Sequence, residues 1–415
     1  MKKNSGGKSR HVFIIGAKGL GGYGGFETFV RKLAEYRPDT AEGGRTRIIY
    51  HICCKENGYG SYDEHLMKHV RELGKKDFSY CGVHCHKIHI PEIGAAQAVL
   101  YDLFSLLWAV RMSIRHRLHG PVFYILSCRL GIVIDVLSWF IHLFGGALYL
   151  NPDGHEWMRE KWSPAIRKYL KFSESRMVRC ADRVICDSEA IEAYIREEYG
   201  LTKERTAFIP YGAELPSVLV EPEAGERAVQ WLSRHGLKPE EYYLMISRLV
   251  PENSYERIIR EFLQSSSSRK LLMITTENPK LKKELERKLH YSEDPRILFA
   301  DAVYDDPMLN AVRKNAYGYI HGHTVGGTNP GLLEAMAHSG FCLVLDVPFN
   351  RETAGDSALY WTGEEGCLSG LIDSADKMKP EQIQKIRTAV KERIRKKYPW
   401  EAIAASYDNV FQYRS

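Results

Sequence analysis

Residues 319–336 combine the residue types that bind a nucleotide diphosphate at a turn between a strand and a helix. Residues 317–320 have the apolar composition of the end of a buried strand, and residues 330–337 predict a helix with proline in its first turn. The connecting loop consists of glycines and small polar residues: Gly322, Thr324, Gly326, Gly327, Thr328 and Asn329. Amides of such a loop approach an anion closely at a helix N-terminus, so the stretch predicts a phosphate site.

Glu334 lies one turn further into the same expected helix. A carboxylate there can accept hydrogen bonds from two adjacent ribose hydroxyls, and phosphate plus ribose describes a nucleotide diphosphate. The alternative is an ordinary glycine-rich loop with a solvated glutamate, and this stretch alone does not separate the two interpretations.

The stretch resembles the C-terminal donor-binding motif of family 4 glycosyltransferases, in which two glutamates are separated by seven residues. Glu334 matches the second glutamate, whereas Gly326 stands where the first is usual, so that contact with the donor sugar is absent or comes from elsewhere. Residues 321–330 resemble one branch of that family, the bacterial rhamnosyltransferases of capsule and cell-wall polysaccharide synthesis. The resemblance implies donor binding by His321, Gly327, Thr328, Asn329 and Glu334.

Two other motifs of that branch are present, Tyr-Gly-Gly-Phe-Glu-Thr at residues 23–28 and Asn-Pro-Asp-Gly at residues 151–154. The resemblance implies that the first motif faces donor and acceptor, with Gly24 and Gly25 on the donor diphosphate and Phe26 and Glu27 on the acceptor. The same loop also satisfies the glycine fingerprint of nicotinamide-dependent oxidoreductases. That class needs an acidic residue at the end of the second strand, and residues 47–52 instead lead into Cys53-Cys54-Lys55.

Residues 151–157 follow an expected strand, at the edge of a parallel sheet where ligands bind. Related enzymes often place a histidine here near the reacting sugar. This chain has Asp153, with His155 two residues later, and both are candidate catalytic residues. The alternative role of Asp153 is that of a helix cap.

Arg248 matches a family arginine that holds the donor diphosphate, while Asn253 occupies the position of the usual lysine. The resemblance therefore implies that Arg248 carries more of the phosphate charge. Its planar guanidinium can bind two phosphate oxygens at once.

A chain of 415 residues is too long for one core and suits two domains. Strands and helices alternate four times before a hinge near residues 212–220 and four times after it. This pattern predicts an α/β protein with two Rossmann-like, doubly wound parallel-sheet domains facing each other across a cleft, the B-type glycosyltransferase (GT-B) architecture. The expected parts are an acceptor-binding domain at residues 1–215, a nucleotide-sugar domain at 216–396, and a helix at 397–415 that crosses back to the first domain.

The composition, with 44% hydrophobic and 27% charged residues, is that of a soluble globular protein. The net charge of +6 permits an anionic substrate or a lipid surface, and no arginine-rich arm points to nucleic acid. Nine cysteines, an odd number, favour reduced thiols in a cytosol. Residues 81–86 lack a second ligand pair at zinc-finger spacing, so no metal site is expected. Residues 1–10 are basic and lack a following apolar core, so they predict a loose tail rather than a signal peptide.

Residues 95–118 predict a long helix with an apolar centre, including Leu103, Leu107 and Trp108, and a basic end. The most hydrophobic window, residues 130–150, is interrupted by charged residues and glycines, and it predicts a short buried helix between strands at 121–126 and 147–150 rather than a membrane span. The basic helix end is either a solvated cap or a contact with lipid headgroups. The basic residues of that end are Arg111, Arg115, His116, Arg117 and His119.

These features together predict a cytoplasmic glycosyltransferase that contacts the inner face of the cell membrane peripherally. The resemblance implies transfer of L-rhamnose from dTDP-L-rhamnose to a lipid-linked saccharide, with retention of anomeric configuration and without a metal or cofactor. A hexosyltransferase using UDP-glucose or UDP-galactose is the alternative of the same class. An NAD-dependent oxidoreductase and a binding module without catalysis are the alternatives from other classes.

Overall fold

The computed structural model describes residues 9–21, 24–37, 46–56, 64–92, 94–216, 222–303 and 305–412. It divides into two compact units. The first unit comprises Met1–Trp157, Pro164–Tyr211 and Trp400–Ser415, and the second comprises Met158–Ser163 and Gly212–Pro399. The expected tail, part of the expected hinge and Tyr23 of the first glycine motif lie outside the described residues.

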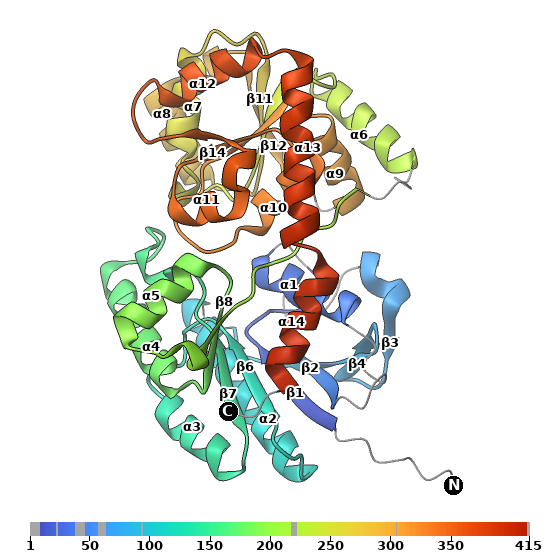
Figure 1. The fold of residues 1–415 in the computed structure, drawn as a ribbon, viewed down its shortest axis with the longest axis vertical. Coiled ribbons are helices and arrows are strands. Elements are labelled where there is room, and N and C mark those ends of the chain that lie inside the picture. The colour runs from blue at the N-terminus through green and yellow to red at the C-terminus, as the bar shows by residue number, and fades with distance from the viewer. Residues whose placement is uncertain are drawn as a thin grey trace. The chain divides into compact units, whose positions relative to one another are not determined.

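The first unit is built on a sheet with the strand order β3-β4-β5-β2-β1-β6-β7-β8-β9 (Figure 1). From β5 to β9 all neighbouring strands are parallel, as the alternation of strands and helices predicts. Their bounds are β1 Ser9–Ile15, β2 Arg47–Lys55, β3 Val70–Glu72, β4 Asp77–Tyr80, β5 Val83–Ile88, β6 Val122–Leu126, β7 Ala147–Asn151, β8 Arg183–Cys186 and β9 Thr206–Phe208.

At one edge, β3, β4 and β5 form an antiparallel meander that the sequence analysis does not anticipate. Cys81 and Gly82 connect β4 to β5, and both have positive φ, 48° and 77°. Two such residues make a turn whose twist matches that of the flanking strands. Cys81 therefore belongs to a hairpin turn, and Cys85 is buried in the following strand.

Helices cover both faces of this sheet: α1 Gly25–Tyr36, α2 Gln97–Arg115, α3 Ile134–Leu143, α4 Pro164–Cys180, α5 Glu189–Tyr199 and α14 Trp400–Gln412. On the face of α14, Phe411 packs against the rings of Tyr50, Tyr124 and Tyr149. On the opposite face, alternate strand residues such as Phe13 pack with α2 in the main apolar core. This alternation along each strand is what a sheet covered on both sides requires.

The expected burial of the helix within residues 130–150 is wrong. The flanking strands are confirmed as β6 and β7, but α3 buries only Ile134, Ser138 and Ile141. Its other side carries large apolar residues that are exposed in the part of the chain that the structure describes, and Trp139 is 61% exposed. Core packing therefore accounts for the apolar residues on one side of α3 but not for those on its exposed side. None of the described helices is long and apolar enough to cross a membrane.

The second unit contains a parallel sheet with the order β12-β11-β10-β13-β14-β15. Its strands are β10 Tyr242–Ile246, β11 Lys270–Thr275, β12 Ile297–Asp301, β13 Gly318–His321, β14 Cys342–Leu345 and β15 Leu359–Trp361. Its helices are α6 Pro222–Arg234, α7 Tyr255–Gln264, α8 Pro279–Leu289, α9 Asp306–Lys314, α10 Pro330–His338, α11 Pro348–Ala354, α12 Cys367–Asp376 and α13 Pro380–Lys397. Contacts group α7, α8 and α12 in one layer and α6, α9, α10 and α13 in the other (Figure 1).

Both sheets reverse their winding once. In the first, the chain proceeds outward from β1 to one edge and then returns to β6 beside β1. In the second, it proceeds from β10 to β12 and then returns to β13 beside β10. The carboxyl ends of the two strands at such a reversal diverge into different helices, which is where doubly wound sheets bind ligands.

Candidate functional site

The β13–α10 turn, residues 322–329, lies at the winding reversal of the second sheet. Because β10 and β13 are paired in parallel, the loop after β10, residues 247–253, meets this turn at the same sheet edge. Gly322 makes the approach possible, since an added Cβ would lie 2.8 Å from the Asn253 carbonyl oxygen and 2.6 Å from the Ile258 side chain. The sequence motifs at residues 248–253 and 319–336 are therefore one site in space.

Asn253 holds the two loops together. Its side-chain amide donates to the Arg248 carbonyl oxygen at 2.7 Å, and its Oδ1 accepts from Nδ1 of His323 at 2.8 Å. The backbone of Thr324 adds a second link, because its N–H donates to the Glu252 carbonyl oxygen at 2.9 Å. Asn253 stands where the resembling family has lysine. It therefore holds the two loops in position but supplies no positive charge.

The two histidines of the turn are neutral bases at ordinary pH. Burial lowers the pKa of His321 to about 3. Burial, followed by the charges of His321, Arg159 and Arg248, holds the pKa of His323 well below its usual value. Because Asn253 offers His323 only an acceptor oxygen, Nδ1 of His323 carries the proton.

Several polar atoms at the site are buried without a hydrogen-bond partner among the described residues. They are Nε2 of His321, Oε2 of Glu252 and Oδ1 of Asn350. Asn350, on α11, also donates to the carbonyl oxygens of His323 and Leu345. Orphaned polar atoms are costly in a dry interior, so their gathering around one turn indicates a place for a polar ligand.

Groups that bind an anion are left open at the same place. The Arg248 side chain is exposed and makes neither a hydrogen bond nor an ion pair with any described residue. The amides of Gly326 and Gly327 likewise donate to no described group. Gly326 has φ +149°, a conformation that residues with a side chain rarely adopt, and it turns the backbone between His323 and the helix.

The first amides of α10 are used by the protein itself. Oδ1 of Asn329, the N-cap residue, accepts from the N–H groups of Gly331 at 2.9 Å and Leu332 at 3.3 Å. Asn329 is therefore a cap in this structure. The amides available to a phosphate are those of the preceding glycines rather than those of the helix.

Glu334 has a protein partner that the sequence analysis does not identify. Its Oε2 lies 2.5 Å from Nη2 of Arg313, a buried residue on α9 whose Nη1 is held by Asn310 at 2.6 Å. The Glu334 side chain is about one-third exposed, and Arg313 fixes the orientation of its carboxylate. An arginine in the last turn of a helix gives no sequence signal of this pairing.

In the first unit, the β1–α1 turn lies at the other winding reversal. Gly16 allows it to approach β6, since an added Cβ would lie 2.4 Å from the Leu126 carbonyl oxygen. The Glu27 carboxylate folds back over the turn, where Oε1 accepts from the Lys18 amide at 2.9 Å. Gly24 is needed for this, because a Cβ there would overlap Glu27. Gly25 faces open space, and Phe26 is half-buried.

Asp153 and His155 follow β7 in a strained loop. Both have positive φ, 60° and 49°, which is uncommon for residues with side chains. Asn151, buried in β7, holds the loop by accepting from the Asp153 amide at 2.8 Å. Strain of this kind persists only where the surroundings enforce it, and it concentrates at functional sites.

His155 packs against aromatic rings, including that of Tyr194 on α5. Its ring is 4.2 Å from that of Tyr194, and burial lowers its pKa. Tyr194 in turn donates to the buried Glu174 and accepts from Lys171. Nδ1 of His155 is buried and has no hydrogen-bond partner in the described part of the chain.

Arg129 is a further charged residue of this region that the sequence analysis misses. It follows β6, and its Nη1 binds the fully buried Asp102 of α2 at 3.0 Å. Burial raises the pKa of Asp102 to about 6, with Arg129 acting in the opposite direction. The sequence offers only a weak signal, a lone arginine directly after a buried strand.

The predicted site residues thus form two groups, each within one unit. Those of the second unit converge on the β10–β13 edge: Arg248, Asn253, His321, Gly327, Thr328, Asn329 and Glu334. Those of the first unit lie on two loops of the other sheet: Gly24, Gly25, Phe26, Glu27, Asp153 and His155.

Residues 9–214 match the family model of a domain of unknown function, DUF1972. No curated protein matches the chain. Among solved structures, the chain is similar to sucrose-phosphate synthase from Thermosynechococcus elongatus, with a TM-score of 0.73, 15% identity and 98% of each chain covered.

The catalytic domain of starch synthase IV from Arabidopsis thaliana, bound to ADP and acarbose, gives a TM-score of 0.71 at 11% identity and covers 98% of this chain and 99% of its own. HepE from Anabaena in complex with UDP gives 0.66 at 14% identity, covering 97% and 99%. The expected fold is confirmed: the chain has the two Rossmann-like domains of the GT-B architecture.

Proposed function

We propose that this protein is a glycosyltransferase that uses a nucleotide-diphosphate sugar and binds its diphosphate at the β10–β13 edge. The observation that carries the proposal is that exposed Arg248 and the amides of Gly326 and Gly327 have no hydrogen-bond partner among the described residues, on two loops that Asn253 joins. Solved neighbours of the same fold were studied with UDP, UDP-glucose or ADP, which supports a nucleotide at such a site.

In the proposed reaction, the bond between the anomeric carbon and the diphosphate oxygen breaks, a hydroxyl oxygen of the acceptor bonds to that carbon, and the proton of that hydroxyl passes to the departing diphosphate. Negative charge grows on the departing diphosphate. Arg248 and the two glycine amides are arranged to stabilise that charge without moving, and preorganised donors of this kind are a major source of rate enhancement. Glu334, oriented by Arg313, accepts from the ribose.

Asp153 and His155 are proposed to contact the reacting sugar. His155 is kept neutral by burial, so it can accept a proton or a hydrogen bond, and the strained loop fixes its direction. Phe26 and Glu27 remain the proposed acceptor contacts. One carboxylate oxygen of Glu27 also accepts a hydrogen bond from the Lys18 amide.

The proposed donor is dTDP-L-rhamnose, and the proposed acceptor is a lipid-linked saccharide at the inner face of the membrane. Both follow from the resemblance of residues 321–330 to the rhamnosyltransferase branch. UDP-glucose or UDP-galactose is the alternative donor. Retention of configuration and a reaction without metal are proposed on the same basis.

A panel of sugar nucleotides, read first by thermal shift and then by nucleotide release, tests this proposal. A nucleotide at about a hundred times its dissociation constant stabilises the folded protein by about 2.7 kcal/mol. We expect dTDP-rhamnose to give the largest shift and to release dTDP only when acceptor is present. Stabilisation by NAD and by no sugar nucleotide would contradict the proposal.

A further inference from the structure

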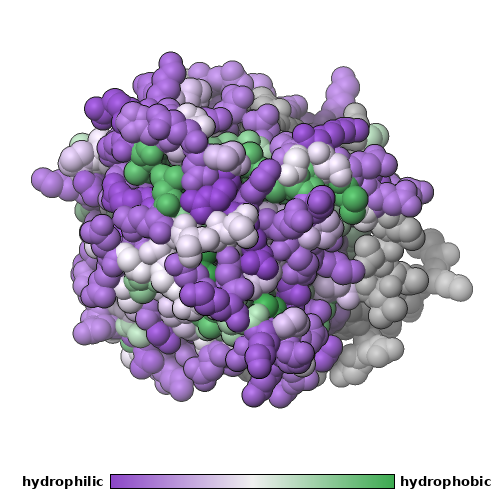
Figure 2. All heavy atoms as spheres, turned by 90° about the horizontal axis from the view of Figure 1, so that it is seen from above, coloured by the Kyte–Doolittle hydropathy of each residue, from purple (hydrophilic) through white to green (hydrophobic). Residues whose placement is uncertain are grey.

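Exposed large apolar side chains are concentrated in one part of the described chain. Of the fourteen exposed large hydrophobic residues found in the described ranges, nine lie between residues 104 and 144. They are Phe104, Leu107, Ile114, Ile132, Val136, Trp139, Phe140, Leu143 and Phe144. The face drawn in Figure 2, by contrast, is mostly hydrophilic, with its hydrophobic residues in small separate groups. We call the nine residues, with α2 and α3 that carry them, the α2–α3 surface.

These residues form helical stripes rather than a random scatter. On α3 and the residues before it, Ile132, Val136, Trp139 and Leu143 recur at intervals of three or four positions. The buried residues of α3 lie on its opposite side. Such an amphipathic helix presents a continuous apolar face outward, and a contiguous apolar patch on a protein surface marks a place where something binds.

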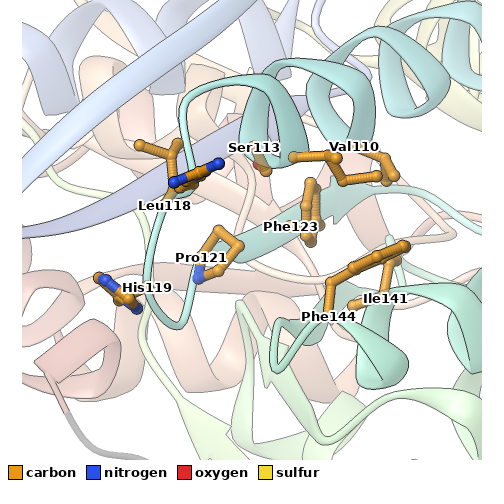
Figure 3. Close-up of a pocket in the computed structure, with 10 residues that line it drawn as sticks. Val110, Ser113, Leu118, His119, Pro121, Phe123, Ile141 and Phe144 are labelled. Carbon is orange, nitrogen blue, oxygen red and sulfur yellow. The ribbon is translucent and has the colours of Figure 1, made fainter.

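The two helices enclose an apolar hollow of about 230 Å³ (Figure 3). Val110 of α2, Phe123 of β6 and the residues Ile141 and Phe144 around the end of α3 face one another across it. The exposed residues Arg117 and His119 also border the hollow. The surface is therefore not flat but has a lined recess beside its positive charges.

Arginines outnumber carboxylates in residues 97–146, by four to two. Arg111, Arg115 and Arg117 are exposed at the C-terminal end of α2. The two carboxylates of residues 97–146 are already paired, Asp102 with Arg129 and Asp135 with Arg176. Guanidinium groups beside an apolar face complement anionic headgroups above an acyl layer.

This charge also argues against a second copy of the chain as the occupant. In a twofold dimer the same patch meets itself, so the three arginines of one copy would lie close to those of the other. Such a contact would bury apolar side chains but bring like charges together. Docking on an anionic lipid surface buries the apolar side chains and also pairs the arginines with opposite charges.

We propose that the α2–α3 surface docks on a lipid surface with anionic headgroups, with Trp139 and its neighbours on α3 entering the acyl boundary. The inference deepens the proposed membrane contact and corrects its location. Trp108, expected at the contact, packs instead against Phe13 and His86 in the core. Aromatic rings such as Trp139 favour the boundary between headgroups and acyl chains.

Sedimentation with vesicles of phosphatidylcholine and phosphatidylglycerol tests the proposal. We expect the Trp139→Ser, Leu143→Ser double variant to bind at least tenfold more weakly than the wild type. Val229→Ser, which removes an exposed valine from α6 of the other unit, is the matched control and should bind normally.

The charge requirement is tested by Arg115→Glu with Arg117→Glu, which should lose binding and abolish the preference for phosphatidylglycerol over phosphatidylcholine alone. The control, Lys280→Glu with Lys283→Glu on exposed positions of α8, makes the same change in net charge at another place and should bind normally. Circular dichroism and dTDP affinity check that each variant is folded.

Insertion has its own readout, because brominated acyl chains quench nearby tryptophan fluorescence. Quenching should occur in the wild type and be lost in Trp139→Phe, which keeps the apolar contact and still sediments. Unchanged binding of the α3 double variant would overturn the proposal. The proposal would also be overturned if the wild type formed a dimer that did not bind vesicles and if the α3 double variant were monomeric. Nucleotide binding is measured separately, so failure here leaves the proposed donor site untouched.

Discussion

The β1–α1 turn of the first unit and the β13–α10 turn of the second are built alike and are used differently. Each lies at a winding reversal, and each starts with a glycine that lets the neighbouring strand or loop approach, Gly16 against Leu126 and Gly322 against Asn253. In the first turn, Glu27 accepts from the Lys18 amide, so a carboxylate of the protein already uses one amide of that turn. In the second, the glycine amides are open and Arg248 is unpaired among the described residues. A glycine-rich turn is therefore an anion site only when the protein leaves its amides free.

The two units also differ in how they bury histidine. In the first, Asp77 accepts from Nδ1 of His86 at 2.6 Å, which leaves Nε2 of His86 to accept from His51 at 3.2 Å. By the same logic His51 accepts from His11 at 2.8 Å. This chain across β1, β2 and β5 satisfies every ring in its neutral form. In the second unit, His321 is neutral through burial alone, and its buried Nε2 has no hydrogen-bond partner among the described residues.

The largest effect we predict is loss of stability in acid. Burial, reinforced by His86, lowers the pKa of His51 to about 2, and burial lowers that of His321 to about 3. Unfolded histidine titrates near 6.5, so below that pH the unfolded chain binds more protons and stability falls as pH falls. Each of these two histidines should lower the free energy of unfolding by about 2 kcal/mol as the pH falls from about 7 to about 5.

Urea unfolding at those two pH values measures this dependence. His51→Gln retains one donor and one acceptor, so it should reduce the pH dependence of the first unit and leave the second unchanged. His321→Asn should do the reverse. Equal pH dependence in the wild type and both variants would show that neither histidine is buried neutral.

The next largest effect concerns Arg248. Removing a charge-assisted contact to phosphate costs about 1.5–3 kcal/mol, so Arg248→Ala should weaken dTDP binding by about 10- to 150-fold. Asn253 cannot compensate, because its amide already holds Arg248 and His323. Calorimetric titration of dTDP decides this, with Lys283→Ala on α8 as a control for loss of one positive charge. Equal affinities would remove Arg248 from the site.

A matched pair of glycine substitutions compares the two turns directly. Gly326→Ala forces a side chain into a conformation that favours glycine, which costs about 1–3 kcal/mol. It should lower both the unfolding midpoint and dTDP affinity. Gly25→Ala meets open space at a helix start and should change stability by less than about 1 kcal/mol. If Gly25→Ala weakened dTDP binding as much as Gly326→Ala, the assignment of the anion site to the second turn would be wrong.

The smallest predicted effect is that of Glu334→Gln. An amide keeps one acceptor, so nucleotide binding should weaken by about 1 kcal/mol, the size of an ordinary hydrogen bond. The loss should be smaller for dTDP, whose ribose lacks the 2′-hydroxyl, than for UDP. Because Arg313 also loses its ion pair, Arg313→Met serves as the control. An equal loss for both nucleotides would assign Glu334 to orienting the helix rather than to the ribose.

The sequence predicts what depends on local composition. Glycine turns, apolar strands and the alternation of strands with helices identify the two sheets, and the motifs at Arg248 and Glu334 lie in the second of them. The sequence does not predict pairings made by packing. Arg313 and Arg129 come from helix ends and strand ends with no distinctive spacing, and the antiparallel meander depends on a turn with positive φ at both Cys81 and Gly82. Apolar composition also cannot distinguish a buried helix from one that is exposed on one side, which is why the burial of α3 is predicted wrongly.

A crystal structure of the protein with dTDP, or with UDP, tests the central claim most directly. We predict diphosphate oxygens within hydrogen-bond distance of the Gly326 and Gly327 amides and of the Arg248 guanidinium, with Glu334 at the ribose and Glu27 still bound to Lys18. A diphosphate bound at the β1–α1 turn, with Glu27 displaced from the Lys18 amide, would contradict the account.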